Sequence, residues 1–270
     1  MKKITLLLIV LLLAACTPRQ TTTSVLKVGM ECNYAPFNWM QPEASDDAVY
    51  VENSKSYCGG YDVLVAKEIA AKLDRKLEIV PIAWEGLIPA LQADSIDLII
   101  AGMTATALRR QEVSFTEPYY YSDYVVLVLN DSAYASARSL EDLAKARFVG
   151  QMSTNYDLII DQIPEVIHEP ALASVPLIVA AIKQKAYDGT VVEKPVANAI
   201  IATNPELTMV EFDKGKGFVQ DEDITTEVSI AVKKENSELL EQIDTILKQL
   251  TVEQREALME KAIKNQPAGE

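Results

Sequence analysis

The sequence contains a single histidine and only three cysteines in 270 residues. It also lacks a Gly-x-Ser-x-Gly motif, a phosphate-binding glycine loop, histidines at metal-ligand spacing and a Cys/His pair placed for nucleophilic attack. The one histidine, His168, lies in the proline-flanked stretch IPEVIHEP, which predicts a solvated loop position. Paired carboxylates occur throughout so acidic a chain and are interpreted as surface charge. We therefore expect neither a metal nor a cofactor, and the few catalytic side chains favour a binding protein over an enzyme.

Basic residues are also few. The chain has 25 Lys and Arg against 39 Asp and Glu, which gives a formal net charge of −14. Because phosphate backbones are bound by positively charged surfaces, nucleic acid is not an expected partner. Residues of the apolar types make up 49% of the chain, and a chain of this length is too large for one small core. A protein of two lobes is the natural expectation.

The amino-terminal segment has the order of a secretory leader. Lys2 and Lys3 precede an apolar run at 4–13, and the letters LAAC close the run at Cys16. The run is shorter than the roughly 20 residues of a membrane-spanning helix. It resembles a bacterial lipoprotein signal, and a plain signal peptide is the alternative. Removal of residues 1–15 would take both lysines and lower the net charge from −14 to −16.

Cleavage of a lipoprotein signal would leave Cys16 as a lipidated amino terminus. Two or more acyl chains, such as palmitate, anchor a protein stably to a membrane. Residues 17–24 are polar and have no apolar periodicity, so residues 16–25 are interpreted as a lipid-bearing tether. No later run is long enough to cross a bilayer. The expected location is the extracellular face of a cell membrane, of the Gram-positive type, where no outer membrane would retain a soluble form.

Two cysteines remain after the leader, Cys32 and Cys58. In an exported protein an even pair of this kind predicts one disulfide. Metal binding is the alternative, but two thiols without a nearby histidine do not complete a zinc site.

Short apolar runs alternate with helical patterns from residue 26 onward. This alternation predicts an α/β sheet with crossover helices. The expected strands are residues 26–30, 77–82, 97–101, 148–150 and 190–192, and the expected helices are 62–73, 87–92, 155–162, 175–184 and two periods within 237–264.

Two further strand-like runs, at 125–129 and 225–232, bracket the second series of elements. Such an arrangement is typical of a chain that crosses twice between two lobes. We expect the first lobe to contain residues 26–121 and 226–270, and the second lobe to contain residues 122–225.

One stretch, AGMTATALRR at 101–110, has the features of an anion site. A buried-type strand runs into Gly102, and Thr106 is a good helix N-cap. Arg109 then falls in the first helical turn, where a cation is favourable only if an anion lies nearby. Backbone N–H groups, threonine hydroxyls and a guanidinium together form a carboxylate receptor. The alternative is that Arg109 and Arg110 are surface arginines.

The stretches NYAPF, GGYDVLVAKEIAAKL, WEGLIPALQADSIDLIIAGMTATALRRQEVSFTEPYYYS and VVEKPVA occur in this order. In order and spacing the chain resembles, from about residue 26 to 262, the polar amino-acid substrate-binding proteins of ABC importers, solute-binding protein family 3. The resemblance implies a two-lobed clamp of the type II periplasmic-binding-protein kind, joined by two hinge crossings. It also implies a monomer that closes on one free amino acid and delivers it to an ABC permease.

The resemblance implies roles for residues that would hold the ligand's α-carboxylate. Arg109 matches the arginine that forms a forked pair with this carboxylate, and Gly102, Met103 and Thr104 match the first lobe's other contacts. In the second lobe the family has a Gly-Thr turn at the start of a helix. Here the turn reads Ser153-Thr154-Asn155, so the glycine is absent, while Thr154 and Asn155 keep hydrogen-bond donors.

The remaining matches concern the ammonium group and the side chain of the ligand. Glu193 matches the acid, usually aspartate, that holds the α-ammonium. Tyr34 matches an aromatic residue that stacks on the ligand, and Trp84 matches the facing wall, although a core position is its alternative. Glu31 matches the acid near the ligand's tip, which favours arginine, lysine, ornithine, histidine or glutamine. Two aromatic faces around a guanidinium favour arginine among these.

Two other functions remain open. Cyclohexadienyl dehydratase resembles the same proteins and would need an acid in the cleft, for which Glu193 is the candidate. An amino-acid sensor domain that feeds a signalling partner is the other. The intact set of amino-acid contacts favours the receptor over both.

Overall fold

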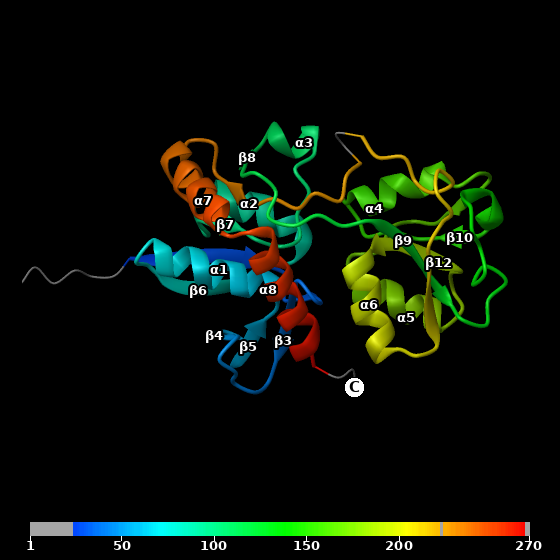
Figure 1. Cartoon of the computed structure of the whole chain (residues 1–270), viewed down its shortest axis with the longest axis horizontal. Helices are drawn as coiled ribbons and strands as arrows, with labels where there is room; N and C mark the ends of the chain where they lie inside the picture. Colours follow the sequence, from blue (N-terminus) through cyan, green and yellow to red (C-terminus); the bar gives the residue numbers. More distant parts are fainter. Residues whose placement is uncertain (1–23, 222–223, 268–270) are drawn as a thin grey trace, which may run out of the picture.

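The computed structural model describes residues 24–221 and 224–267, and its two lobes lie side by side in Figure 1. The expected leader, the lipidated Cys16 and most of the tether lie outside the described residues. Val25, the last residue of the expected tether, is instead the first residue of strand β1 (Val25–Met30). Within the described part of the chain, no helix is long and apolar enough to span a membrane.

The first lobe is built on a five-stranded sheet in the order β6-β1-β7-β14-β8. Strand β1 runs parallel to β6 and β7, whereas β14 is antiparallel to β7 and β8. Because β14 comes from a late part of the sequence, the chain returns to this lobe after building the other. The strands besides β1 are β6 (Lys76–Pro81), β7 (Leu98–Ile99), β8 (Ser114–Phe115) and β14 (Ala231–Val232).

The helices of this lobe follow from their apolar spacing and end residues. Helix α1 (Tyr61–Lys72) has Asp62 in its first turn and Lys72 in its last, where their charges complement the helix dipole. Helix α8 (Val252–Asn265) begins at a capping box formed by Thr251 and Gln254. The others are η1 (Trp84–Gly86), α2 (Leu87–Gln92), α3 (Ala107–Arg110) and α7 (Ser237–Gln249).

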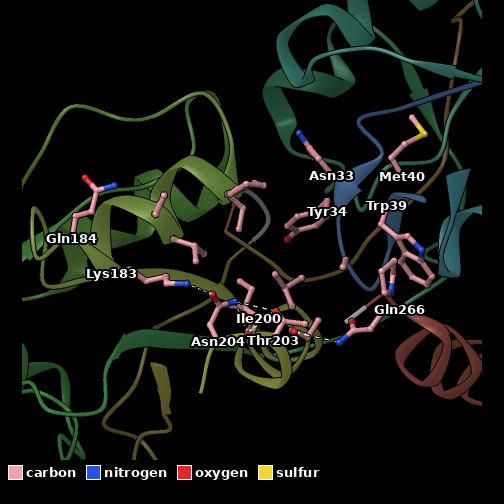
Figure 2. Close-up of a pocket in the computed structure, with 18 residues that line it drawn as sticks. Asn33, Tyr34, Trp39, Met40, Lys183, Gln184, Ile200, Thr203, Asn204 and Gln266 are labelled. Carbon is pink, nitrogen blue, oxygen red and sulfur yellow. Dashed lines mark hydrogen bonds between the residues drawn. The ribbon is translucent and has the colours of Figure 1, made fainter. Parts of the chain in front are cut away.

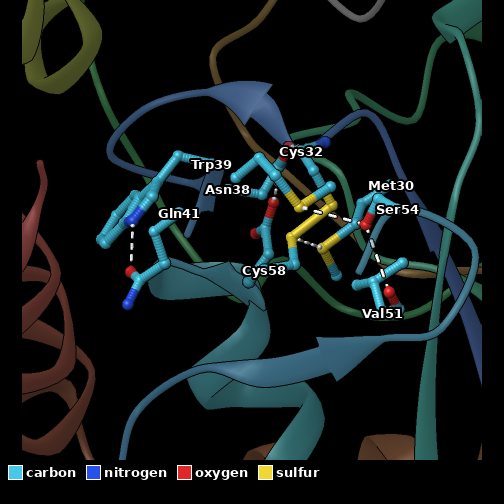
Figure 3. The surroundings of a disulfide bond; sticks show 10 residues. Met30, Cys32, Asn38, Trp39, Gln41, Val51, Ser54 and Cys58 are labelled. Carbon is cyan, nitrogen blue, oxygen red and sulfur yellow. Dashed lines mark hydrogen bonds between the residues drawn. A yellow bond between two sulfur atoms is a disulfide. The ribbon is translucent and has the colours of Figure 1, made fainter. Parts of the chain in front are cut away.

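A small antiparallel sheet extends the first lobe in the order β2-β3-β5-β4. A disulfide between Cys32 and Cys58 joins the segment before β2 to β5, with their Cα atoms 6.0 Å apart. Figure 3 shows the bond buried beside Met30, whose Sδ lies 3.7 Å from Cys58 Sγ. The predicted pairing is therefore present in the structure. The strands are β2 (Asn33–Tyr34), β3 (Asn38–Gln41), β4 (Val49–Val51) and β5 (Ser56–Gly59).

Removing this disulfide is expected to destabilise the protein. The bond closes a loop with a sequence separation of 26, and the chain-entropy model gives such a crosslink about 3 kcal/mol. The variant Cys32→Ser/Cys58→Ser should lose about that much free energy of unfolding in urea titrations. Wild-type protein treated with a reductant is the control and should shift by a similar amount. A double variant as stable as the oxidised wild type would contradict this expectation.

The second lobe contains a five-stranded sheet in the order β11-β10-β12-β9-β13. Strand β9 (Tyr124–Leu129), which lies between β12 and β13, is buried along its whole length, which explains its continuous apolar sequence. The other strands are β10 (Arg147–Phe148), β11 (Ile167–His168), β12 (Gly189–Glu193) and β13 (Leu207–Val210), and the helices are η2 (Leu140–Leu143), α4 (Asn155–Leu158), η3 (Ile159–Gln162), α5 (Val175–Lys183) and α6 (Lys194–Thr203).

His168 does not lie in a solvated loop, so that prediction is wrong. It belongs to β11, and its side chain is 23% exposed. Its ring nitrogens lie 2.7 Å from Asp161 Oδ1 and 3.0 Å from Asp157 Oδ1. Burial lowers the pKa of His168, but the two carboxylates outweigh it and raise this pKa overall. The histidine therefore fastens β11 to the segment formed by α4 and η3.

Two chain segments cross between the lobes next to each other (Figure 1). Tyr120 and Val228 form an isolated antiparallel bridge, and Thr104 pairs with Val228 on the other side. The run at 225–232 is therefore a strand only at Ala231–Val232; the part before it is crossing chain rather than sheet. The crossings place the facing ends of both sheets around one cleft.

Candidate ligand-binding cleft

Arg109 is held in the cleft between the lobes. It lies in α3, three residues after the N-cap Thr106, whose side chain accepts a hydrogen bond from the Arg109 backbone N–H. Only 9% of its surface is exposed, so the surface-arginine alternative does not apply to it. Its Nη1 donates to the Thr104 carbonyl at 2.8 Å, and its Nη2 donates across the cleft to the Ser153 carbonyl at 2.9 Å. Burial lowers the pKa of Arg109 to about 10, which leaves the guanidinium charged at neutral pH.

Trp84 lies against this arginine. The Arg109 guanidinium carbon is 4.9 Å from the centre of the Trp84 ring, a cation–π distance. The indole N–H donates to the Ser153 carbonyl at 3.2 Å. Trp84 is half-buried at the start of η1 and faces the other lobe. The structure therefore places it on the cleft wall rather than wholly in the core.

The start of α4 brings two predicted residues of the second lobe to the cleft. Thr154 is the N-cap residue, and its hydroxyl donates to the Gln151 carbonyl at 2.7 Å. The Asn155 amide donates to the Thr225 carbonyl at 2.7 Å and contacts Thr104 Oγ1 at 3.4 Å. Both side chains are almost fully buried. Asn155 therefore joins the second lobe to a hinge segment and to the first lobe.

Ser153 occupies the place where the resembled family has glycine. Its φ is 60°, a left-handed conformation that is unfavourable for residues with a Cβ. Its hydroxyl donates across the cleft to Glu85 Oε1 at 2.8 Å. The serine thus has a backbone conformation that favours glycine and adds a contact between the lobes.

Glu193 is fully buried at the end of β12. Its Oε1 accepts a short hydrogen bond from the Tyr156 hydroxyl, whereas its Oε2 has no hydrogen-bond partner among the described residues. Burial raises the pKa of Glu193 to about 8. The Tyr34 side chain is also buried in the cleft, beside Tyr156; burial raises the pKa of Tyr34, and a hydrogen bond with Tyr156 opposes that rise. An unpaired buried oxygen such as Glu193 Oε2 is costly, which indicates a place for a ligand.

Glu31 accepts hydrogen bonds from Gln151, a residue that the sequence alone does not identify as part of the site. Gln151 Nε2 lies 3.4 and 3.3 Å from the two carboxylate oxygens of Glu31 and 3.4 Å from the Ala173 carbonyl. Burial raises the pKa of Glu31, and the Gln151 hydrogen bond opposes that rise. Gln151 is almost fully buried; it lies three residues after the end of β10 and three residues before Thr154. Its place just before a helix N-terminus was the only available sign of a role.

Gly102 and Tyr34 touch at the floor of the cleft. Gly102 has a φ of 60°, and a Cβ on it would lie 3.0 Å from Tyr34 Cε1. The tight contact and the left-handed backbone both favour glycine there. Met103, by contrast, is buried in the core, and its carbonyl accepts the Ser229 N–H at 2.8 Å. The structure brings together the other predicted ligand residues but leaves the Met103 side chain in the core.

An apolar cavity of about 620 Å³ opens beside Tyr34, between the lobes. Figure 2 shows the Tyr34 side chain reaching into this space above Ile200 and Thr203 of α6. Gln266, which follows α8, donates to the Ala199 carbonyl at 3.2 Å and bridges the lobes at the edge of the cavity. Of the predicted ligand residues only Tyr34 lines it. The other predicted ligand residues lie in a neighbouring part of the cleft, where side chains of the two lobes contact each other directly.

Residues 26–265 match the family model of bacterial extracellular solute-binding proteins, family 3. The chain belongs to this family. Family members have the type II periplasmic-binding fold, and the predicted two-lobed α/β architecture is confirmed. The family membership inferred from the sequence motifs is confirmed as well.

Known relatives and a solved structure agree with this assignment. A probable histidine-binding protein of Campylobacter jejuni is 33% identical over 202 residues, which cover 73% of this chain and 72% of the relative. The ABC transporter arginine-binding protein 1 of Escherichia coli is 27% identical over 242 residues, covering 89% and 91%. A crystal structure of the substrate-binding protein of an amino acid ABC transporter has a TM-score of 0.73 and 30% identity, covering 90% and 100%. The relatives carry the names of transport proteins rather than enzymes.

The ligand-free protein is expected to lose stability as the pH rises. The pKa of Glu193 is raised from 4.5 to about 8 in the fold, so between these values the folded state binds more protons than the unfolded state. Rising pH therefore favours unfolding, by at most about 1.4 kcal/mol per pH unit for one group. Denaturant titrations from pH 5 to pH 9 measure this slope. The variant Glu193→Gln is the control and should flatten it; an equal slope in both proteins would contradict the burial of an uncharged Glu193.

Proposed function

We propose that this protein is an extracellular receptor that binds one free amino acid between its lobes and delivers it to an ABC importer. The observation that carries the proposal is the presence in one cleft of a buried, charged Arg109 and a buried Glu193 whose Oε2 has no partner among the described residues. A guanidinium suits an α-carboxylate, and a carboxylate suits an α-ammonium. The cleft therefore offers a guanidinium to the carboxylate of an amino-acid zwitterion and a carboxyl group to its ammonium, whose positive charge would favour the ionised form of Glu193.

The ligand would replace contacts that the lobes now make with each other. Arg109 and Trp84 both donate to the Ser153 carbonyl across the cleft. A carboxylate placed there would accept the same guanidinium as a charged partner, together with the donors at the start of α4. The ligand carboxylate would replace the neutral Ser153 carbonyl as the partner of Arg109. This stronger, charged contact would favour closure of the two lobes around the ligand by hinge motion.

We infer that the ligand has a basic or polar side chain, with arginine favoured. Glu31 already accepts the Gln151 amide through both oxygens, and N–H groups of a ligand tip would take the same oxygens. Trp84 and Tyr34 offer aromatic faces for a flat cation. The histidine- and arginine-binding names of the two relatives support the same class of ligand.

The variant Glu31→Gln is expected to change ligand preference. A neutral amide keeps the size of Glu31 but removes the charge that favours a cationic tip. Affinity for arginine should fall about tenfold or more, whereas affinity for glutamine should change less, because hydrogen bonds to charged groups are the stronger kind. Competition of both amino acids for the two proteins measures the ratio. An unchanged ratio would show that Glu31 does not select the tip.

We also propose that Cys16 is lipidated and holds the protein, as a monomer, at the extracellular face of the cell membrane beside its permease. The order of charges, apolar run and LAAC at the leader supports this. Metabolic labelling with a palmitate analogue, with Cys16→Ser as the control, tests it. Labelled Cys16→Ser protein would contradict the anchor.

One observation favours the enzymatic alternative. A buried Glu193 with a pKa of about 8 is the kind of neutral acid that a dehydratase of the cyclohexadienyl class needs. A turnover assay with a cyclohexadienyl substrate separates the two functions. We expect no product, and product that disappears in Glu193→Gln would favour the enzyme.

A thermal-shift screen of ligand-stripped protein against the common amino acids tests the receptor proposal as a whole. A ligand that binds only the folded state raises the midpoint by mass action. We expect arginine to give the largest shift, followed by other basic or amide amino acids. If no amino acid raises the midpoint, the receptor proposal is wrong.

A further inference from the structure

A buried carboxylate lies between the two loops that carry the proposed contacts of the first lobe. One loop holds Glu31 and Tyr34, and the other starts at Gly102. Asp62, in the first turn of α1, is fully buried. Its carboxylate lies near the Gly102 backbone N–H, which opposes the rise in pKa that burial causes, and two neutral side chains connect it to both loops.

Each connection is a chain of two hydrogen bonds that ends on a backbone N–H group. On one side the Tyr119 hydroxyl donates to Asp62 Oδ1 at 2.6 Å and accepts the Gly102 N–H at 3.2 Å. On the other side the Asn38 amide donates to Asp62 Oδ2 at 2.8 Å, and its oxygen accepts the Cys32 N–H at 2.7 Å. Asp62 is therefore the common acceptor of two chains that begin in different loops.

The direction of these hydrogen bonds requires a carboxylate. Every donor points toward Asp62, and both of its oxygens accept. An asparagine there could accept at only one atom, and its N–H group would face either the N–H group of Asn38 or the Tyr119 hydroxyl, whose own hydrogen would then lose its acceptor. Turning Asn38 over would restore the bond between the two amides but would lose the one to Cys32. Burial raises the pKa of Asp62 to about 6, which still leaves it ionised at neutral pH.

The two N–H groups lie at irregular points of the backbone. Cys32 has a φ of 55° and Gly102 a φ of 60°, both left-handed. Neither belongs to a strand, so both need partners outside the sheet ladders. The loops meet where the Tyr34 ring packs on Gly102. A shift of either loop would move this ring relative to the start of the Arg109 segment.

We propose that Asp62 is a positioning residue that sets the spacing of the two ligand-binding loops of the first lobe without touching the ligand. The proposal rests on the proposed function, because the spacing matters only if both loops bind one amino acid. Both chains end on backbone N–H groups of the loops that carry the proposed ligand contacts.

Two variants test the proposal, with arginine as the probe. Asp62→Asn leaves only one oxygen to accept the two hydrogen bonds. Tyr119→Phe keeps the ring but removes the hydroxyl that joins Gly102 to Asp62. We expect Asp62→Asn to weaken arginine binding by about tenfold or more, as loss of hydrogen bonds to a charged group implies. Amide hydrogen exchange should become faster at both Cys32 and Gly102. Tyr119→Phe should speed exchange at Gly102 alone and weaken binding less.

Thr116→Val is the matched control. Thr116 is buried in the same lobe, and its hydroxyl accepts the Ile230 N–H at 3.0 Å, away from both loops. It should lower stability without faster exchange at Cys32 or Gly102. Unchanged affinity and exchange in folded Asp62→Asn would overturn the proposal. If Asp62→Asn does not fold, Tyr119→Phe decides by the same two measurements.

The proposed receptor function can fail independently of the positioning role proposed for Asp62. If the wild type binds no amino acid, the receptor is wrong, and exchange at Cys32 and Gly102 still shows whether Asp62 holds the loops. Slow exchange in the wild type that becomes fast at both amides in Asp62→Asn supports the proposal. Equal exchange in the two proteins contradicts it.

Discussion

Replacing Arg109 by alanine is expected to weaken arginine binding more than about 100-fold, because a forked pair of charge-assisted hydrogen bonds is lost and the ligand carboxylate stays poorly paired. In the structure both ends of the guanidinium are fixed by hydrogen bonds, one to the Thr104 carbonyl and one to the Ser153 carbonyl. A side chain held in this way loses little freedom when it binds. Calorimetric titration of stripped protein with arginine measures the change.

Two other variants show whether binding depends on the Arg109 side chain itself or on positive charge in general. Arg110 neighbours Arg109 but is exposed, and its Nε donates to the Ala105 carbonyl at 2.9 Å. Arg110→Ala should bind arginine as the wild type does. Arg109→Lys keeps the charge but loses the fork, so its affinity should lie between those of the wild type and Arg109→Ala. Near-normal binding by Arg109→Ala would show that the carboxylate site lies elsewhere.

Replacing Glu193 by glutamine is expected to weaken binding about 100-fold while leaving the ligand-free fold intact. The amide has the size of the carboxylate but presents no charge to an ammonium, and a buried charged pair contributes far more than a neutral one. Without ligand the change removes an ionisable group whose charged form is penalised by burial, so stability at pH 9 should not fall. Titration with arginine and urea unfolding at pH 9 measure the two effects.

Glu193→Asp is the informative companion of this variant. It restores the acid that the family usually has and keeps the charge, although it shortens the reach. We expect it to retain arginine binding within about tenfold. Loss of binding in Glu193→Asp together with full binding in Glu193→Gln would contradict an ammonium contact at this position.

Much of the fold could be predicted from apolar spacing. The helix expected at 62–73 is α1 (Tyr61–Lys72), and the strand expected at 77–82 is β6 (Lys76–Pro81). The run at 225–232 was harder to assign, because a segment that crosses between lobes is extended and apolar like a strand. The part of the run before β14 makes only isolated bridges, at Val228. Residues 155–162 form α4 followed by η3 rather than one helix. Local pattern alone does not reveal such a change of helix type.

The site was predictable only in part. The sequence identifies Arg109 and Glu193 as candidates, and the structure shows both buried in the cleft. The contact of Gln151 with Glu31 joins residues 120 positions apart, so it depends on how the lobes meet and has no local pattern. The sequence identifies Asp62 only as the first residue of the helix expected at 62–73. Its burial against Tyr119 and Asn38 follows from the packing of three separate segments.

The most direct test of the account compares arginine with agmatine, which is arginine without its carboxylate, in calorimetric titrations of the stripped wild-type protein. Agmatine keeps the guanidinium tip and the amine, so it can still use Glu31 and Glu193, but it offers nothing to Arg109. The account predicts saturable binding of one arginine per chain and at least about 100-fold weaker binding of agmatine. Equal binding of both compounds, or no binding of arginine, would contradict an amino-acid site built on Arg109.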